Sequence, residues 1–162
     1  MRSGFIDGFE RRRRHLPHWE QPGATYFLTF NLQDRNAVDL SATHIAQTIV
    51  AALKHDDGHR YWLYDYVVMP DHVHLLLRVP AHDGKSEALW RIAQSLKGWL
   101  SRRINELTGR AGTLWQQETY DHIVRNREDF EEKARYIFQN PYAAGIVDES
   151  GEWRWWGRGK GE

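Results

Sequence analysis

Two neighbouring apolar runs constrain the fold of this chain more than any other feature. Residues 61–69 read YWLYDYVVM and residues 72–79 read HVHLLLRV, and both are rich in the residue types that strands favour. The string Met69-Pro70-Asp71 leaves space for only a tight break between them. Strands joined so closely pair with each other as a hairpin, so we expect an antiparallel sheet at the centre of the fold.

The remaining segments alternate between strand and helix patterns. One more strand is predicted over residues 24–32, and a short extended piece over 113–115. Helices are predicted from Ser41, which is a plausible N-cap, over 86–107, and over 127–139. The last of these should end at Asn140-Pro141, because the residue before Pro avoids the helical region. This order predicts an α+β fold, with one antiparallel-rich sheet and helices packed on it.

The composition excludes several kinds of site. The 162 residues contain no Cys, which excludes disulfide frameworks, thiolate zinc sites and a cysteine nucleophile. No apolar run approaches the roughly 20 residues that span a bilayer. The N-terminal residues also lack the apolar stretch of a secretory signal. We therefore expect a soluble, cytoplasmic protein with no membrane partner.

The formal net charge is zero, which by itself argues mildly against a general nucleic-acid binder. The charges are nevertheless distributed in blocks. Residues 1–15 carry five Arg against two acidic residues, and residues 85–110 carry six basic against two acidic residues. A local imbalance is usually ordinary surface charge. The alternative interpretation is a pair of basic surfaces that flank an acidic, metal-binding centre.

His72 and His74 are the first candidates for chemistry. Residues i and i+2 of a strand point to the same face, so the two imidazoles should lie side by side while Val73 enters the opposite face. Two adjacent imidazoles are half of a site for a divalent cation. The structural alternative is two histidines that happen to alternate, because His-x-His is a short motif with many false matches.

Tyr136 and Asn140 are the second pair. Residues four apart lie on one face of a helix, so a phenol and an amide oxygen can reach the same point. Taken alone, the pair is better interpreted structurally: Tyr136 would be a half-buried core residue and Asn140 would cap the helix. Tyr120, in a polar cluster, is the rival tyrosine, but Val124 occupies its +4 position. Gln139 is a rival amide at a less favourable helical angle to Tyr136.

Together, the two pairs suggest a metal-assisted reaction at phosphorus. Two His and one amide oxygen suit a hard or borderline divalent ion such as Mg²⁺ or Mn²⁺ and leave coordination positions open. Such an ion is a Lewis acid for a phosphoryl oxygen. A nearby Tyr can then attack phosphorus and form a covalent intermediate.

Four segments carry a resemblance to a known family. They are GATYFLTFNL, YVVMPDHVHLLL, SLKGWLSRRIN and HIVRNREDFEEKARYIFQNPYAAGIV. In this order they resemble the single-tyrosine HUH transposases, and most closely the branch of REP-associated tyrosine transposases. The resemblance runs from about Arg11 to Trp156, and its most specific part is the pairing of MPDHVHLLL with YIxxNP.

The resemblance implies a ferredoxin-like (RRM-like) fold of the HUH endonuclease type. It implies that His72, His74 and Asn140 are ligands of Mg²⁺ or Mn²⁺ and that Tyr136 is the nucleophile. The substrate would be single-stranded DNA that forms palindromic hairpins, cut to leave a 5′-phosphotyrosine and a free 3′-OH. The 3′-OH of another cut strand can resolve the phosphotyrosine link, so the reaction needs no external energy source and no nucleotide cofactor is expected. The resemblance implies a monomer or a homodimer, because the transposases proper act as dimers whereas the REP-associated branch can act as a monomer.

The resemblance also suggests an organisation and a DNA-binding surface. We expect a basic arm over 1–23, a transposase domain over 24–147 and a Trp-rich tail over 148–162. Some of the rings of the tail should pack back onto the domain, and the alternative is that they stack on unpaired bases. Basic residues of the arm and of the long helix are candidates for phosphate contacts; they are Arg11, Arg12, Arg13, Arg14, Lys97, Arg102 and Arg103. Nucleoid association would follow. The main alternative is a catalytically silent hairpin-binding protein of the same fold.

Overall fold

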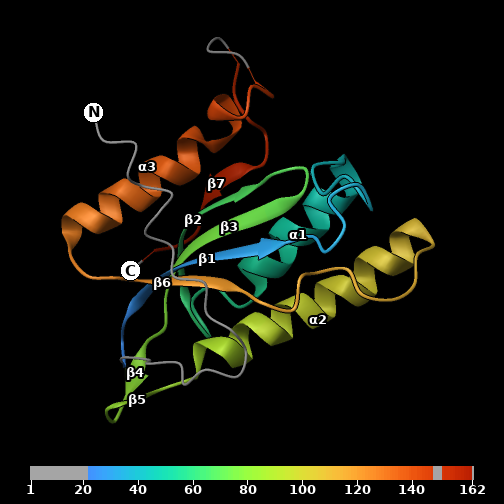
Figure 1. The fold of residues 1–162 in the computed structure, drawn as a ribbon. Coiled ribbons are helices and arrows are strands. Elements are labelled where there is room, and N and C mark those ends of the chain that lie inside the picture. Colours follow the sequence, from blue (N-terminus) through green and yellow to red (C-terminus); the bar gives the residue numbers. More distant parts are fainter. Residues whose placement is uncertain (1–21, 148–150, 162) are drawn as a thin grey trace.

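The computed structural model describes residues 22–147 and 151–161, so the prediction for Arg11–Arg14 lies outside the described residues. Figure 1 shows a central sheet with helices on both of its faces. The elements in chain order are β1 (Thr25–Asn31), α1 (Thr43–His55), β2 (Trp62–Val68), β3 (His72–Arg78), β4 (Ala81–His82), β5 (Lys85–Ser86), α2 (Leu89–Thr108), β6 (Tyr120–Val124), α3 (Arg127–Ala143) and β7 (Trp156–Arg158).

The main sheet has the strand order β6-β1-β3-β2-β7, and every neighbouring pair is antiparallel. The predicted hairpin is confirmed, because β2 and β3 pair with Val68 opposite Val73. The first four strands of that order, with α1 and α2 as crossovers, form the βαββαβ arrangement of a ferredoxin-like fold. The predicted fold class is therefore confirmed.

The alternation along β3 divides the core into two layers. Val73, Leu75 and Leu77 belong to the large apolar cluster that α1 and α2 cover. Leu76 belongs to a smaller cluster on the other face of the sheet, which α3 covers. We call this second face the α3 face. Residues of β3 are buried on both faces of the sheet, because helices cover both faces and β3 is the middle strand.

The third helix is longer than the sequence predicts. It does not end at Asn140-Pro141, because α3 continues through Pro141 to Ala143. A proline inside a helix removes one backbone hydrogen bond. Here only the last turn follows it, and that turn is closed by hydrogen bonds from Ala144 N to Asn140 O and from Ile146 N to Pro141 O. Pro141 is itself buried, so its ring gains contacts there.

Three other boundaries differ from the predictions. Residues 113–115 form no strand beyond a single bridge from Trp115 to Leu32, and the short strand is β6 instead. Ser41 is not the N-cap of α1, because its hydroxyl donates to Asp39 and the helix begins two residues later. The helix α2 begins at Leu89, since Ser86 pairs within the small β4–β5 hairpin.

The C-terminal residues return to the sheet. Strand β7 pairs with β2, and the rings of Trp153, Trp155 and Trp156 pack against the two core clusters. The expectation that these rings pack back onto the domain is confirmed. Within the part of the chain that the structure describes, no helix is long and apolar enough to cross a membrane.

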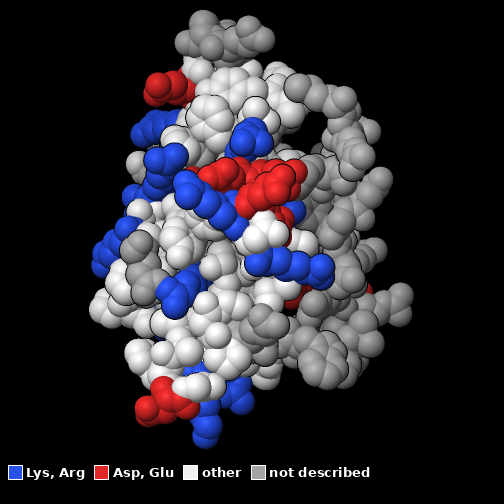
Figure 2. Space-filling view, turned by 90° about the vertical axis from the view of Figure 1, so that its left-hand side faces the viewer, with Lys and Arg blue, Asp and Glu red and all other residues white. Residues whose placement is uncertain are grey.

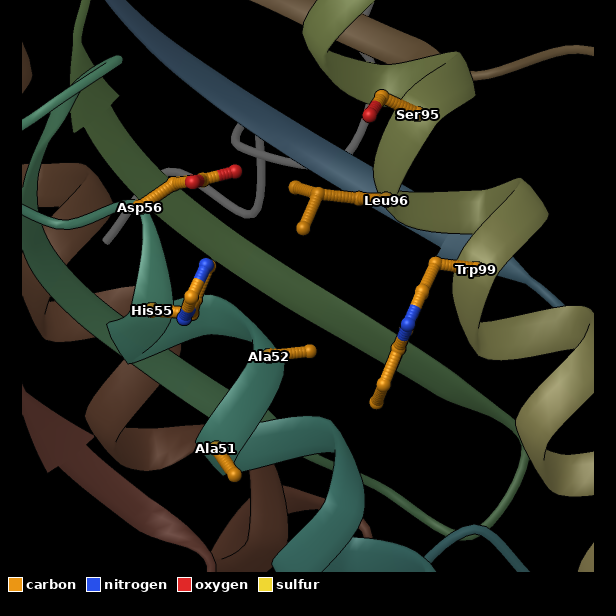
Figure 3. Close-up of a pocket in the computed structure, with 7 residues that line it drawn as sticks. All are labelled: Ala51, Ala52, His55, Asp56, Ser95, Leu96 and Trp99. Atoms are coloured by element: carbon orange, nitrogen blue, oxygen red, sulfur yellow. The ribbon is translucent and has the colours of Figure 1, made fainter.

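The surface charges are mixed and local. Figure 2 shows the side of the molecule at the left of Figure 1, where acidic side chains lie between basic ones. Along α3, Arg127 Nε and Glu131 Oε1 pair at 3.0 Å. A cavity of about 450 Å³ lies between α1 and α2, on the face of the sheet opposite α3. Small residues of α1 and Trp99 of α2 are among the residues that line it (Figure 3).

Candidate nucleic-acid cleavage site

The two histidines lie side by side on the α3 face of β3. Their ring centroids are 4.6 Å apart, as the i, i+2 spacing predicts. His72 lies opposite Asn31 and His74 opposite Thr29 on the neighbouring strand β1. The pair therefore lies at the start of the central strand, on the face that α3 covers, and buried polar side chains there need partners.

Hydrogen bonds from outside the pair orient His72. Its Nδ1 lies 2.7 Å from Asp71 Oδ1, so a carboxylate holds the proton on that nitrogen. Its Nε2 faces the other way and lies within hydrogen-bond distance, 3.2 Å, of Asn140 Oδ1. A side chain of β3 and a side chain of α3 thus meet at this point.

His74 is oriented by Thr29. Its Nδ1 lies 2.8 Å from Thr29 Oγ1, and the residue is buried. Burial, and to a smaller extent the neighbouring His72, holds the pKa of His74 well below its ordinary value. The imidazole is therefore neutral near pH 7, which is the form that binds metals.

Tyr136 completes the group from α3. Its ring centroid lies 5.3 Å from that of His74 and 5.9 Å from that of Phe27. Burial raises the pKa of the Tyr136 phenol, and a hydrogen bond with Asn140 acts in the opposite direction. Asn140 contacts both Tyr136 and His72, so the predicted helical spacing joins the two pairs.

The rival side chains lie farther from this point. Tyr120 is on β6 opposite Thr29, so one strand separates it from His74, although it shares the α3 face. Gln139 is exposed on α3. The structure thus brings together His72, His74, Tyr136 and Asn140, and it leaves Tyr120 at the border of the group.

Sequence reasoning missed the two residues that orient the histidines. Asp71 directly precedes His72, and its place in the Pro-Asp-His string could have indicated a carboxylate partner. Thr29 is 45 positions from His74, and only the register of β1 against β3 brings them together. No local pattern in the sequence could have found Thr29.

A separate charged cluster holds the first half of α3 to the sheet. His122 Nε2 of β6 lies 3.0 Å from Asp129 Oδ2, and Lys133 Nζ lies 3.3 Å from Asp129 Oδ1. Lys133 is buried. His122 is therefore neither isolated nor part of the His72–His74 group, and it ties β6 to α3.

The candidate phosphate contacts on α2 lie on the opposite side of the sheet from this group. Lys97 Nζ donates to Gln116 O at 2.7 Å and to Thr119 Oγ1 at 3.1 Å, so it holds the segment before β6. Arg102 and Arg103 are exposed, and Arg103 pairs with Glu106 at 3.1 Å. The Lys97 ammonium therefore binds neighbouring residues of the chain, whereas Arg102 and Arg103 lie at the surface.

The donor set fits a divalent ion. Two imidazole rings and an amide oxygen lie together, and these are groups that bind divalent ions; His72 Nε2 lies 3.2 Å from Asn140 Oδ1. Within residues 22–147 and 151–161, no three His, Cys, Asp or Glu side chains cluster as a metal site. The fit therefore depends on the amide of Asn140 as the third ligand.

A family model described as "Transposase IS200 like" matches residues 24–149 of the chain. The chain belongs to the IS200-like transposases. This IS200-like transposase is 26% identical over 131 residues to the REP-associated tyrosine transposase of Escherichia coli (strain K12), covering 81% of the chain and 74% of that relative. A relative from Haemophilus influenzae is 28% identical over 140 residues, covering 81% of the chain and 77% of the relative.

A solved structure of a transposase has a similar fold. A REP-associated tyrosine transposase bound to a REP hairpin matches with a TM-score of 0.66 at 22% identity, covering 90% of this chain and 82% of that one. At this identity the match shows the fold, and the fold is the one described above. The predicted resemblance to REP-associated tyrosine transposases is thereby confirmed.

Proposed function

We propose that this IS200-like transposase cuts and rejoins single-stranded DNA, with Tyr136 as the nucleophile. The observation that carries the proposal is the convergence of His72, His74, Asn140 and Tyr136 between β3 and α3. The substrate we propose is DNA that folds into palindromic hairpins. Support comes from the E. coli relative, which is named for its REP association, and from the solved relative, which is bound to a REP hairpin.

The reaction conserves the energy of the phosphodiester bond. The Tyr136 oxygen attacks phosphorus, the bond from phosphorus to the 3′ oxygen breaks, and the strand is left with a 5′-phosphotyrosine. The phenol proton leaves, and the departing 3′ oxygen gains a proton to become a free 3′-OH. In the second step a 3′-OH of another cut strand attacks the phosphotyrosine and releases the phenol, so a strand is transferred with no nucleotide cofactor.

His72, His74 and Asn140 are the residues that would hold Mg²⁺ or Mn²⁺. When bound there, such an ion supplies Lewis-acid stabilisation of charge on the phosphoryl oxygens. Asp71 and Thr29 serve this purpose indirectly, because each occupies the Nδ1 side of one histidine and leaves the Nε2 side for binding. All four residues of the site come from one chain, so a monomer is sufficient for the reaction as proposed.

The test is the formation of a covalent adduct on labelled hairpin DNA. The protein is incubated with a single-stranded hairpin and Mn²⁺, and denaturing electrophoresis separates the protein–DNA adduct. Wild type should form the adduct and Tyr136→Phe should not. Tyr120→Phe is the matched control and should retain it. An adduct that survives Tyr136→Phe but not Tyr120→Phe would show that the nucleophile is wrongly assigned.

A second variant separates catalysis from binding. His74→Ala should abolish metal-dependent cleavage, and hairpin affinity measured by gel shift should stay within a few-fold of wild type. Unchanged cleavage would remove the metal role. Hairpin binding by wild type without any adduct would instead identify a catalytically silent hairpin-binding protein of the same fold.

A further inference from the structure

The C-terminal strand lies beyond the segment that the family model matches. The match ends at residue 149, whereas β7 covers Trp156–Arg158. Figure 1 shows β7 beside β2, on the side of the sheet toward α3. Backbone bonds continue on both sides of β7, from Val68 N to Trp155 O and from Gly159 N to Tyr64 O, both at 2.9 Å. The docked segment therefore extends well past the three residues of the strand.

Two glycines show that β2 is shaped to receive this segment. A Cβ on Gly157 would lie 2.4 Å from the Tyr66 hydroxyl, and a Cβ on Gly159 would lie 2.4 Å from the Leu63 carbonyl oxygen. Contacts this short force an atom to move, and at Gly159 that atom belongs to the backbone. Only glycine permits such a close approach at this position.

Asp57 provides an anchor for the end of the segment. The residue is only 2% exposed. Oδ1 accepts a hydrogen bond from Leu63 N at 2.9 Å, and Oδ2 accepts one from Lys160 N at 2.7 Å. The C-terminal segment therefore supplies one of the two backbone N–H groups that satisfy this carboxylate. The turn after α1 is thus matched to this segment.

The opposite end of the segment contacts α3 near the reacting group. The indole N–H of Trp153 donates to Val68 O at 2.9 Å, and the Trp156 ring packs edge-on against Phe138 at 5.0 Å. Both indoles belong to the apolar cluster of the α3 face that also includes Tyr136. Tyr142, in the last turn of α3, donates to Gly151 O at 2.9 Å. The segment therefore bridges β2 and the half of α3 that carries Tyr136 and Asn140.

We propose that residues 153–161 are a positioning element, which holds the second half of α3 against the sheet so that Tyr136 faces the two histidines. Gly159 and Asp57 are positioning residues that anchor the segment, and Trp153 and Trp156 transmit its position to α3. The part of this inference that concerns strand cleavage rests on the proposed function. The part that concerns the seating of α3 does not.

Gly159→Val tests the inference at a distance from the reacting group. The added side chain meets the Leu63 backbone and should undock the segment. Gly98→Val is the matched control, because a Cβ there meets only the Arg102 guanidinium at 3.9 Å, on the opposite face of the sheet. A second test variant ends the full chain before Trp153. Hydrogen exchange with mass spectrometry, adduct formation in a single turnover and hairpin affinity are measured for all variants.

We expect both test variants to exchange amide hydrogens in residues 127–143 at least tenfold faster than wild type, with α1 and α2 unchanged. Their adduct rate should fall at least tenfold while hairpin affinity stays within threefold. Unchanged exchange in α3, or an adduct rate equal to or above that of wild type, would overturn the inference. If wild type forms no adduct, the proposed function fails, but the exchange comparison still decides whether the segment seats α3.

Discussion

At the scale of single residues, the orientation of His74 depends on one hydroxyl. Thr29 Oγ1 is 2.8 Å from His74 Nδ1, and both side chains are buried. Thr29→Val keeps the shape of the side chain but leaves that nitrogen without a partner, which costs about 1–3 kcal/mol. We expect urea unfolding to show that loss, and we expect Mn²⁺ affinity measured by calorimetry to fall about 10–100-fold.

The matched control for this prediction lies on the same strand. Thr25 is at the other end of β1 and points to the same face, four residues from Thr29. Thr25→Val should leave Mn²⁺ affinity unchanged. Equal Mn²⁺ affinity for Thr29→Val and wild type would mean that the hydroxyl does not orient a metal ligand.

The same residues show which parts of the site the sequence can predict. His72 and His74 follow from a period of two within a strand, and Tyr136 and Asn140 follow from a spacing of four within a helix. Both are local rules. Thr29 depends on strand register between segments 45 residues apart, which no local rule contains. The sequence therefore predicts the four side chains of the proposed site and not the partner that orients His74.

At the scale of elements, α3 is held to the sheet at its beginning by a carboxylate. Asp129 lies beside His122 of β6 and Lys133 of its own helix, and it accepts a hydrogen bond from Arg125 N at 3.1 Å. Burial raises the pKa of the Asp129 carboxyl, but the hydrogen bonds from His122 and Arg125 and the charge of Lys133 together outweigh it. The pKa is therefore held below its ordinary value.

This shift predicts how acid destabilises the fold. The folded-state pKa lies below the unfolded value of about 4, so the ionised carboxylate stabilises the fold above pH 4. That stabilisation is lost as the pH falls through the folded-state pKa. Asp129→Asn should therefore lower the free energy of unfolding at pH 7 and flatten its dependence on pH below about pH 4, as measured by urea unfolding at a series of pH values.

Glu128 provides the control for the acid series. It lies in the same first turn of α3 and is exposed. Glu128→Gln should keep the pH dependence of wild type. If Asp129→Asn and wild type lose stability equally between pH 4 and pH 2, the carboxylate does not fasten α3.

The boundaries of the elements are harder to predict than their order. The local rule predicts that Pro141 ends the third helix, but it ignores the contacts that the buried ring gains within the last turn. The sequence pattern favours a short strand at 113–115 over one at 120–124, because β6 is an edge strand that is only partly buried and its alternation is weak. Tertiary contacts decide both cases.

At the scale of the whole molecule, the sheet separates the proposed site on the α3 face from the basic helix α2. Sequence patterns place Lys97, Arg102 and Arg103 together, but they do not show which face of the sheet a helix covers. The Lys97 ammonium holds the segment before β6, with its bonds to Gln116 and Thr119. Arg102 and Arg103 remain exposed to a ligand. DNA that reaches both these arginines and Tyr136 has to pass around an edge of the sheet.

This geometry predicts different effects for the three cations. A double variant with Arg102→Ala and Arg103→Ala should weaken hairpin binding and reduce the slope of log affinity against log salt by about one for each phosphate that is no longer neutralised. Lys97→Met should mainly lower the free energy of unfolding, because two oxygens lose their donor. Arg91→Ala removes the same charge from the start of α2, against the Trp90 ring, and should leave the salt slope unchanged. Fluorescence anisotropy over a range of salt concentrations measures all three slopes. If the double variant keeps the affinity and slope of wild type, hairpin DNA is bound by the α3 face without α2.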